Sequence, residues 1–167
     1  MGLFSKAAPP LTEKNLPDQS GKVFTVTSRT GGLGHHLVKM LYAQNAKVWI
    51  AAHSGEKATK IMDQIKAIHP SSRGALLYLQ LELNDLKTIK ASAEKLITQE
   101  NSLHVLWNNV VPTPLHKAPY TAAEEKAKIS PPGAVRVVWV SSSAAKNFAL
   151  EGGLDVANLD YHGEKGV

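Results

Sequence analysis

The chain has 167 residues, 43% of them hydrophobic, which is enough for one globular domain with a buried core. Its 19 basic and 14 acidic side chains give a formal net charge of +5. Because the basic residues are scattered and no basic run alternates with aromatics, we do not expect a nucleic-acid partner. The absence of cysteine excludes disulfides, thiol catalysis and cysteine metal ligands. With no apolar run as long as a membrane span and no signal-peptide core at the start, we expect a cytoplasmic protein with no membrane partner.

The first residues differ in character from the rest of the chain. Residues 1–21 contain Pro9, Pro10 and Pro17 among polar side chains, so we expect an irregular lead-in there. Regular apolar patterns begin at Lys22. We therefore expect residues 22–167 to form a single domain.

Strand-like and helix-like patterns alternate along this domain. We expect strands at 23–26, 48–51, 75–81, 105–107 and 135–140, and helices at 34–44, 56–68 and 85–98. The side chains expected to face the core are Leu33, Leu37, Met40 and Leu41 in the first helix, Ala58, Ile61, Met62, Ile65 and Ile68 in the second, and Leu86, Ile89, Ala93 and Leu96 in the third. Such alternation predicts a doubly wound, Rossmann-like α/β fold of about five parallel strands, with a ligand crevice at their carboxyl ends.

A glycine-rich turn follows the first strand. Gly31, Gly32 and Gly34 would let the backbone approach a phosphate at the start of the next helix, although Gly-Gly also occurs in ordinary turns. The spacing Thr27-Ser28-x-x-x-Gly32-Leu33-Gly34 resembles the Thr-Gly-x-x-x-Gly-x-Gly turn of the short-chain dehydrogenase/reductase family, which uses NAD(H) or NADP(H). Ser28 replaces the first glycine of that motif and adds a Cβ at a tight turn.

The resemblance implies which residues bind the cofactor. In the glycine-rich turn these are Thr27, Ser28, Arg29, Gly32, Leu33 and Gly34. His53, Arg29 or Lys57 would meet a 2′-phosphate, the alternative being that they are solvated loop charges. Because no acidic residue ends the second strand, we expect NADP rather than NAD.

Two later segments continue the resemblance. Leu81-Glu82-Leu83 is similar to a family segment whose aspartate contacts the adenine edge, and Asp85 is explained more simply as a helix cap. Asn108-Asn109-Val110-Val111 is similar to the family's Asn-Asn-Ala-Gly, with two valines adding bulk beside the cofactor. The alternative for Asn108 and Asn109 is an ordinary polar strand end.

The connection before the fifth strand is short. Residues 112–134 predict one helix over 121–129 with Thr121 as its cap and Glu124 three residues on. The resembled family has a longer helix here that carries an active-site asparagine. We therefore expect the fourth strand to have an uncovered face, open to self-association or a partner.

The resemblance also implies a catalytic group. Ser142, after the fifth strand, matches the serine that polarises the substrate carbonyl, and Tyr161 and Lys165 have the spacing of the family's proton donor and its helper. Gly163 between them disfavours the helix that such a pair needs. In the alternative, residues 152–162 are a loop that precedes the true Tyr-x-x-x-Lys helix, so the chain would stop before its active site.

Two functional hypotheses follow. One is an NADP(H)-dependent oxidoreductase acting on a ketone or secondary alcohol, which by resemblance to fungal members would belong to secondary metabolism. The other is a truncated, catalytically inactive relative that keeps only the nucleotide-binding module.

We expect no metal, because the adjacent His35 and His36 point in different directions on a helix. No Gly-x-Ser-x-Gly elbow surrounds Ser141–Ser143, which argues against a hydrolase, and the oligomeric state stays open.

Overall fold

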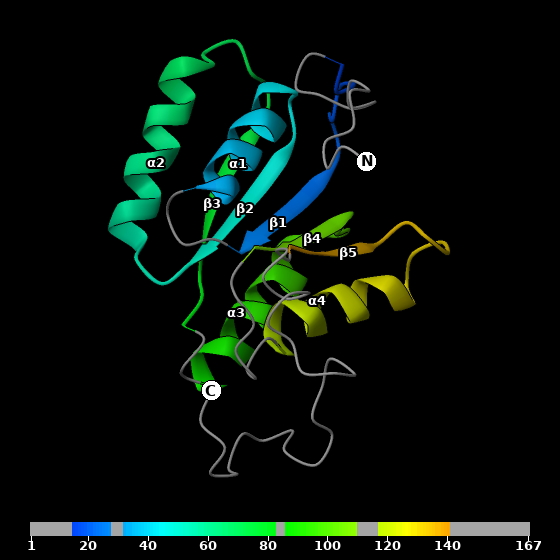
Figure 1. Ribbon diagram of the computed structural model, residues 1–167. Coiled ribbons are helices and arrows are strands. Elements are labelled where there is room, and N and C mark those ends of the chain that lie inside the picture. Colours follow the sequence, from blue (N-terminus) through cyan, green and yellow to red (C-terminus); the bar gives the residue numbers. More distant parts are fainter. Residues whose placement is uncertain (1–14, 28–31, 83–85, 110–116, 141–167) are drawn as a thin grey trace, which may run out of the picture.

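The computed structural model describes residues 15–27, 32–82, 86–109 and 117–140. These residues form five strands and four helices that alternate along the chain (Figure 1). In chain order they are β1 (Val23–Thr27), α1 (Leu33–Ala43), β2 (Lys47–Ala52), α2 (Gly55–Ile68), β3 (Ala75–Gln80), α3 (Leu86–Gln99), β4 (Val105–Asn108), α4 (Lys117–Lys128) and β5 (Arg136–Trp139). The predicted order of elements is confirmed, with ends that differ by a few residues.

All five strands belong to one parallel sheet in the order β3-β2-β1-β4-β5. From β1 the chain proceeds outward to β2 and β3, and then returns to place β4 on the other side of β1. The order of strands therefore reverses between β1 and β4, which is the place where ligands bind in open α/β sheets. At that place Thr27 is the register partner of Asn108.

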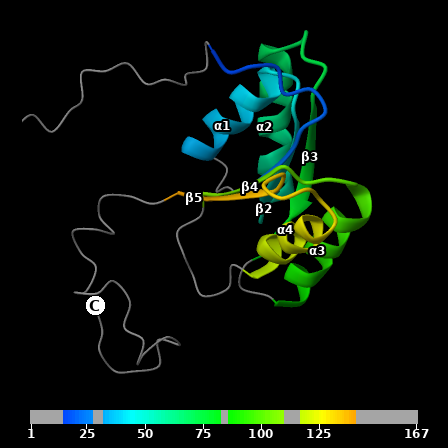
Figure 2. The same ribbon diagram turned by 90° about the vertical axis from the view of Figure 1, so that its right-hand side faces the viewer.

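Helices cover both faces of the sheet. Figure 1 and Figure 2 show α1 and α2 together on one face, with α3 and α4 side by side on the other. This arrangement is the predicted doubly wound, Rossmann-like fold. None of the helices in the described ranges is both long and apolar enough to cross a membrane.

Each face of the sheet has its own hydrophobic core. Because side chains alternate along a strand, β1 contributes Val23 to the core under α3 and α4, and Phe24 and Val26 to the core under α1 and α2. All five residues of β1 are buried, as expected for the central strand of a sheet covered on both sides.

Two residues predicted to face the core are exposed. Leu33 is 70% exposed and Ile68 is 55% exposed, and each lies at an end of its helix. The helical period predicts which side of a helix is apolar, but it does not predict whether the end of that side is covered. Val38 and Tyr42, which were not predicted, are buried in α1 instead.

The expectation of a wholly uncovered face on the fourth strand is wrong. Leu106 of β4 is fully buried in the same core as Ala122 and Ala123 of α4. Small side chains on α4 let that helix lie close to the sheet, and the same alanines gave the sequence no large apolar stripe by which to predict the packing. The helix begins at Lys117, so Thr121 lies inside it and is not the predicted cap.

A buried lysine joins α4 to the helix beside it. Lys126 is 6% exposed, and its Nζ donates a hydrogen bond of 2.8 Å to the carbonyl oxygen of Ile97 in the last turn of α3. The last carbonyls of a helix lack intrahelical partners, and a cation is favourable at this end of the helix dipole. The interaction therefore fixes α4 against α3.

Candidate functional site

The carboxyl ends of β1 and β4 are joined by one side chain. The Thr27 hydroxyl oxygen accepts a hydrogen bond of 3.1 Å from the backbone N–H of Asn109, and the same hydroxyl lies 3.4 Å from the carbonyl oxygen of Trp107, to which it donates. Thr27 is buried. Its hydroxyl therefore holds the exit of β4 in a fixed position beside the end of β1.

Asn108 lies between Trp107 and Asn109 in the sequence, and its side-chain amide is buried. It is 1% exposed, and neither its Oδ1 nor its Nδ2 has a hydrogen-bond partner within the part of the chain that the structure describes. An unpaired buried amide costs about 1–3 kcal/mol, so such a group in a native fold calls for a reason. The sequence predicted Asn108 and Asn109 as neighbours of a cofactor, and both lie at the strand reversal.

The start of α1 lies at the same end of the sheet. Gly32 immediately precedes this helix with φ of 68° and ψ of −143°, a conformation that L side chains rarely adopt. Gly32 has no side chain with which to cap the helix, and no acidic residue lies in the first turn. Within the described residues, the first N–H groups and the positive end of the dipole therefore have no capping side chain, which is the arrangement that favours an anion.

The space beside Gly32 is also open. A Cβ built on this residue would have no atom of the other described residues, its chain neighbours aside, within 4 Å. Gly34, two residues on, is buried against the rest of the fold. The first glycine thus leaves room for a ligand to approach the backbone, and the second lets the helix pack closely. Leu33 between them is exposed and contributes no core contact.

The side chains of His53 and Glu82 contact each other at the neighbouring strand ends. His53 follows β2, Glu82 follows β3, and the Nδ1 atom of His53 contacts the Glu82 carboxylate. The side chain of His53 is 77% exposed and that of Glu82 is 25% exposed. The sequence assigned these residues separately, to a 2′-phosphate and to an adenine edge, and gave no sign that they meet.

The first turn of α2 lies next to His53. Ser54 is its cap and accepts a hydrogen bond of 3.4 Å from the backbone N–H of Lys57, whose side chain is exposed. Sequence reasoning missed Ser54, although a serine just before a helical pattern is the usual sign of a cap. Tyr78 of β3 donates to the carbonyl oxygens of Ala52 and His53, at 3.1 and 3.2 Å. Burial raises the pKa of the Tyr78 hydroxyl, which favours its donor form.

The remaining site predictions fall outside the described residues. These are Ser28 and Arg29 of the turn, Asp85, Val110 and Val111, and the catalytic residues Ser142, Tyr161 and Lys165. Of the described ones, Thr27, Gly32, Leu33, Gly34, Asn108 and Asn109 are at or beside the β1 and β4 ends. His53, Glu82 and Lys57 form a second group at the ends of β2 and β3 and the start of α2.

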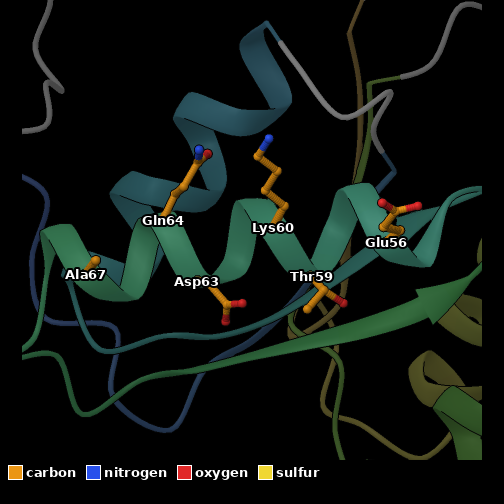
Figure 3. A pocket seen from close by; sticks show the side chains of 6 residues that line it. All are labelled: Glu56, Thr59, Lys60, Asp63, Gln64 and Ala67. Atoms are coloured by element: carbon orange, nitrogen blue, oxygen red, sulfur yellow. The ribbon is translucent and has the colours of Figure 1, made fainter.

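A separate surface hollow lies on α2. Its lining comes from Glu56, Thr59, Lys60, Asp63, Gln64 and Ala67 (Figure 3). All six belong to one helix, and Lys60 and Asp63 point in different directions, so the groups do not converge on a ligand. In the described ranges, no three His, Cys, Asp or Glu side chains are grouped so as to hold a metal ion.

Comparison with known proteins identifies the family. Residues 22–148 match the family model described as short chain dehydrogenase. The chain belongs to the short-chain dehydrogenase/reductase family. This family uses nicotinamide dinucleotides, so the ligand to compare with the carboxyl ends of β1 and β4 is a dinucleotide. Gly32 and the start of α1, which no described side chain caps, fit a pyrophosphate, and the Asn108 amide, which has no partner among the described residues, fits a polar ligand.

Fungal members of the family are similar to the chain over most of its length. A short-chain dehydrogenase/reductase from Phomopsis amygdali is 43% identical, with 95% of this chain and 54% of the relative aligned. The short-chain dehydrogenase/reductase pkfC from Emericella nidulans is 40% identical, with 95% of this chain and 58% of the relative aligned. This short-chain dehydrogenase/reductase chain therefore spans little more than half the length of these relatives.

Solved structures support the fold. The promiscuous reductase LugOII superposes with a TM-score of 0.62 at 22% identity, covering 78% of this chain and 63% of that protein. The L-sorbose reductase from Gluconobacter frateurii superposes with a TM-score of 0.58 at 16% identity, covering 77% and 55%. At these identities the likeness is one of fold.

Proposed function

We propose that this short-chain dehydrogenase/reductase chain binds NADP(H) at the carboxyl ends of β1 and β4, and that it transfers hydride between a ketone and a secondary alcohol. The observation that carries the proposal is the meeting of an uncapped helix start, preceded by Gly32, with strand ends held together by Thr27 and Asn109. Family membership supports a nicotinamide dinucleotide as the ligand. Resemblance to fungal family members supports a role in secondary metabolism.

The preference for NADP over NAD rests on charge at the end of β2. NAD-binding folds commonly carry an acidic residue there that accepts hydrogen bonds from the ribose. In this chain β2 ends in Ala51 and Ala52 and is followed by His53, and Lys57 lies in the first turn of α2. These basic groups favour a 2′-phosphate, while Gly32 and the first turn of α1 bind the pyrophosphate.

The proposed chemistry assigns three residues beyond β5. When bound, the nicotinamide supplies or accepts the hydride. The Ser142 hydroxyl donates a hydrogen bond to the substrate oxygen, the Tyr161 hydroxyl gives or takes its proton, and the Lys165 ammonium lowers the pKa of that tyrosine. This assignment rests on the order and spacing of these residues in the sequence.

A titration with NADPH tests the binding step. We expect saturable enhancement of nicotinamide fluorescence and a higher melting temperature, because a ligand that binds only the folded state stabilises it. Gly32→Ala should weaken NADPH binding at least about tenfold, or about 1.4 kcal/mol. Gly133→Ala is the matched control, because Gly133 has φ of 77° and an equally open Cβ position but lies in the turn before β5. Both residues have a positive φ that disfavours an added Cβ, so a loss of NADPH binding in Gly32→Ala that Gly133→Ala does not share is assigned to the ligand site.

A turnover assay then separates the two functional hypotheses. For an active enzyme, Tyr161→Phe should abolish reduction of carbonyl substrates while NADPH affinity stays within about twofold, since the hydroxyl acts on the substrate. Tight NADPH binding without turnover of any carbonyl compound would favour the inactive nucleotide-binding relative. No binding at millimolar cofactor would overturn the proposal.

A further inference from the structure

Basic side chains mark the start of every strand in the sheet. In the order of the strands across the sheet these are Arg73 at β3, Lys47 at β2, Lys22 at β1, His104 at β4 and Arg136 at β5. Because the strands are parallel, their starts share one edge of the sheet, formed by the ends without arrowheads in Figure 1. This edge, whose basic side chains we call the basic row, lies at the opposite end of the strands from the proposed dinucleotide site.

Backbone hydrogen bonds hold the basic row in line. The N–H of Lys47 donates 3.0 Å to the carbonyl oxygen of Lys22, the N–H of His104 donates 2.9 Å to that of Val23, and the N–H of Arg136 donates 2.9 Å to that of His104. Neighbouring strands lie about 4.8 Å apart, so the row extends over about 19 Å. Its charges are therefore placed by the sheet.

Acidic side chains near this edge offset only part of the row. Glu100 lies 3.1 Å from Lys47 Nζ through its Oε2, and its Oε1 accepts a hydrogen bond from Trp49. Lys22 and Arg136 are exposed, and neither has an ion pair with another described residue. These two side chains leave positive charge on both sides of β4.

The fold itself does not explain these cations. Lysines in the last turns of α2 and α4 are favoured by the helix dipole, and these are Lys66, Lys126 and Lys128. A sheet has only a small net dipole, so strand starts offer no comparable attraction. Since like charges repel one another, the row disfavours the isolated chain, and an anionic partner would relieve the repulsion.

A hollow of about 390 Å³ lies beside the row, between the starts of β1, β2 and β3 and the end of α3. Its lining includes Lys47, Arg73, Gln99, Glu100, Asn101 and Ser102. The amides and the hydroxyl are hydrogen-bonding groups for a carboxylate, and no aromatic ring lines the hollow as a platform for a nucleic-acid base. A recess beside a line of cations fits acidic side chains that project from a peptide.

We propose that the basic row docks an acidic segment of a partner protein in an extended conformation. Alternate side chains of an extended segment lie about 7 Å apart, so three carboxylates cover about 14 Å of the row. One of them enters the hollow, and the others face Lys22 and Arg136. The carboxyl ends of β1 and β4 stay open, so this docking does not compete with a dinucleotide.

The test measures binding of a fluorescein-labelled hexaglutamate peptide to the full chain by fluorescence anisotropy. We expect saturable binding that weakens with added salt, because exposed charges are screened, and none for the hexaglutamine peptide. The double variant Lys22→Glu with Arg136→Glu should lower the affinity at least about tenfold, since it reverses both unpaired charges. The milder pair Lys22→Gln with Arg136→Gln should lower it in the same direction by less.

The matched control is Lys60→Glu with Lys90→Glu. Both lysines are exposed, on α2 and α3, and the pair changes the net charge by the same amount away from the row. Its peptide affinity should stay within about twofold of wild type, since salt screens charges more than about 10 Å away. Equal losses in the two charge-reversal variants, or no binding of hexaglutamate at low salt, would overturn the inference.

Two further measurements define the partner and separate this inference from the proposed function. Vesicles containing phosphatidylserine, or duplex DNA, should bind more weakly than the peptide, and tighter binding of either one through Lys22 and Arg136 would overturn the assignment to a protein partner. NADPH affinity should be the same in wild type and all three double variants. Peptide binding without NADPH binding would overturn the proposed function and leave the docking site standing.

Discussion

The hydroxyl oxygen of Thr27, at the end of β1, accepts a hydrogen bond of 3.1 Å from the backbone N–H of Asn109, which follows β4. This hydrogen bond lies beyond the last register pair of the two strands, Thr27 with Asn108, and so extends their connection by one residue. The strand order reverses at this boundary, and the proposed dinucleotide site opens there. One buried side chain thus sets the spacing of the two strand ends that the site needs.

Replacing this hydroxyl should affect both stability and the site. Thr27→Val keeps the side-chain shape but leaves the Asn109 N–H without an acceptor, so we expect the free energy of unfolding to fall by about 1–3 kcal/mol. Thr27→Ser keeps the hydroxyl and should lose about 1 kcal/mol for one buried methyl group. Urea unfolding measures both variants. NADPH affinity should fall in the valine variant at temperatures where it is folded, and equal affinity in the two variants would argue against the spacing role.

Gly74, just before β3, should tolerate no side chain. A Cβ at this residue would lie 2.4 Å from the carbonyl oxygen of Ala46, which accepts the hydrogen bond from Ala75 that begins the pairing of β2 with β3. Gly74→Ala should therefore destabilise the fold by about 1–3 kcal/mol, although glycine to alanine changes at unstrained positions usually stabilise. Thermal unfolding measures the loss. The exposed Ser71→Ala nearby should stay within about 0.5 kcal/mol of wild type, and a similarly small effect at Gly74 would contradict the clash.

Glu100 should stabilise the end of α3 through a buried tryptophan. Its Oε1 accepts a hydrogen bond of 2.8 Å from Trp49 Nε1, and its Oε2 lies 3.1 Å from Lys47 Nζ. Glu100→Ala would leave the buried indole N–H unpaired, so we expect a loss of about 2–3 kcal/mol. Glu100→Gln keeps an acceptor for Trp49 and should lose less than half as much, because Lys47 is partly exposed and its ion pair is screened. Equal losses in the two variants, measured by urea unfolding, would assign the effect to the ion pair instead.

His104 should make stability depend on pH. Its Nδ1 accepts a hydrogen bond of 3.0 Å from the backbone N–H of Val23, which requires an unprotonated nitrogen. Burial, and then the positive charge of Lys22, lower the pKa of His104 below its usual 6.5. As the pH falls below about 6.5 the unfolded chain binds the proton first, so this contribution to the free energy of unfolding declines and is lost once the pH passes the folded-state pKa.

A difference experiment isolates the contribution of His104. His104→Asn keeps a side-chain acceptor near the Val23 N–H but does not titrate. Unfolding by urea between about pH 5 and 8 should show a decline toward low pH that is steeper in wild type than in this variant. A decline of the same steepness in both would assign the pH dependence to other groups.

Much of the fold was predictable from local patterns in the sequence. The β-branched runs at β1 and β2 and the helical stripes of α2 and α3 gave the type and order of these elements, because a strand or helix buried on one side must repeat its apolar residues with a fixed period. Helix ends were predicted less well. Leu33 has the right type and spacing for a core residue, yet it lies at the first position of α1 and is exposed.

The candidate site was predictable only in part. Gly32 and the two asparagines have a recognisable spacing, so their placement near one another could be inferred from the resemblance. The hydrogen bond from Asn109 to Thr27 and the contact of His53 with Glu82 could not, since each joins residues far apart in sequence through the register of neighbouring strands. The packing of α4 was missed because Ala122 and Ala123 give no apolar stripe.

By itself the sequence determined the alternation of strands and helices, the position of the glycine turn and the family resemblance, because these depend on residue type and spacing along one stretch of chain. The tertiary structure decided which side chains meet at the strand ends and which face of β4 is covered. Those contacts depend on the order and register of parallel strands, whose pairing is set by packing between distant segments. The partners of Thr27 and His53 therefore became known only once β4 lay beside β1 and β3 beside β2.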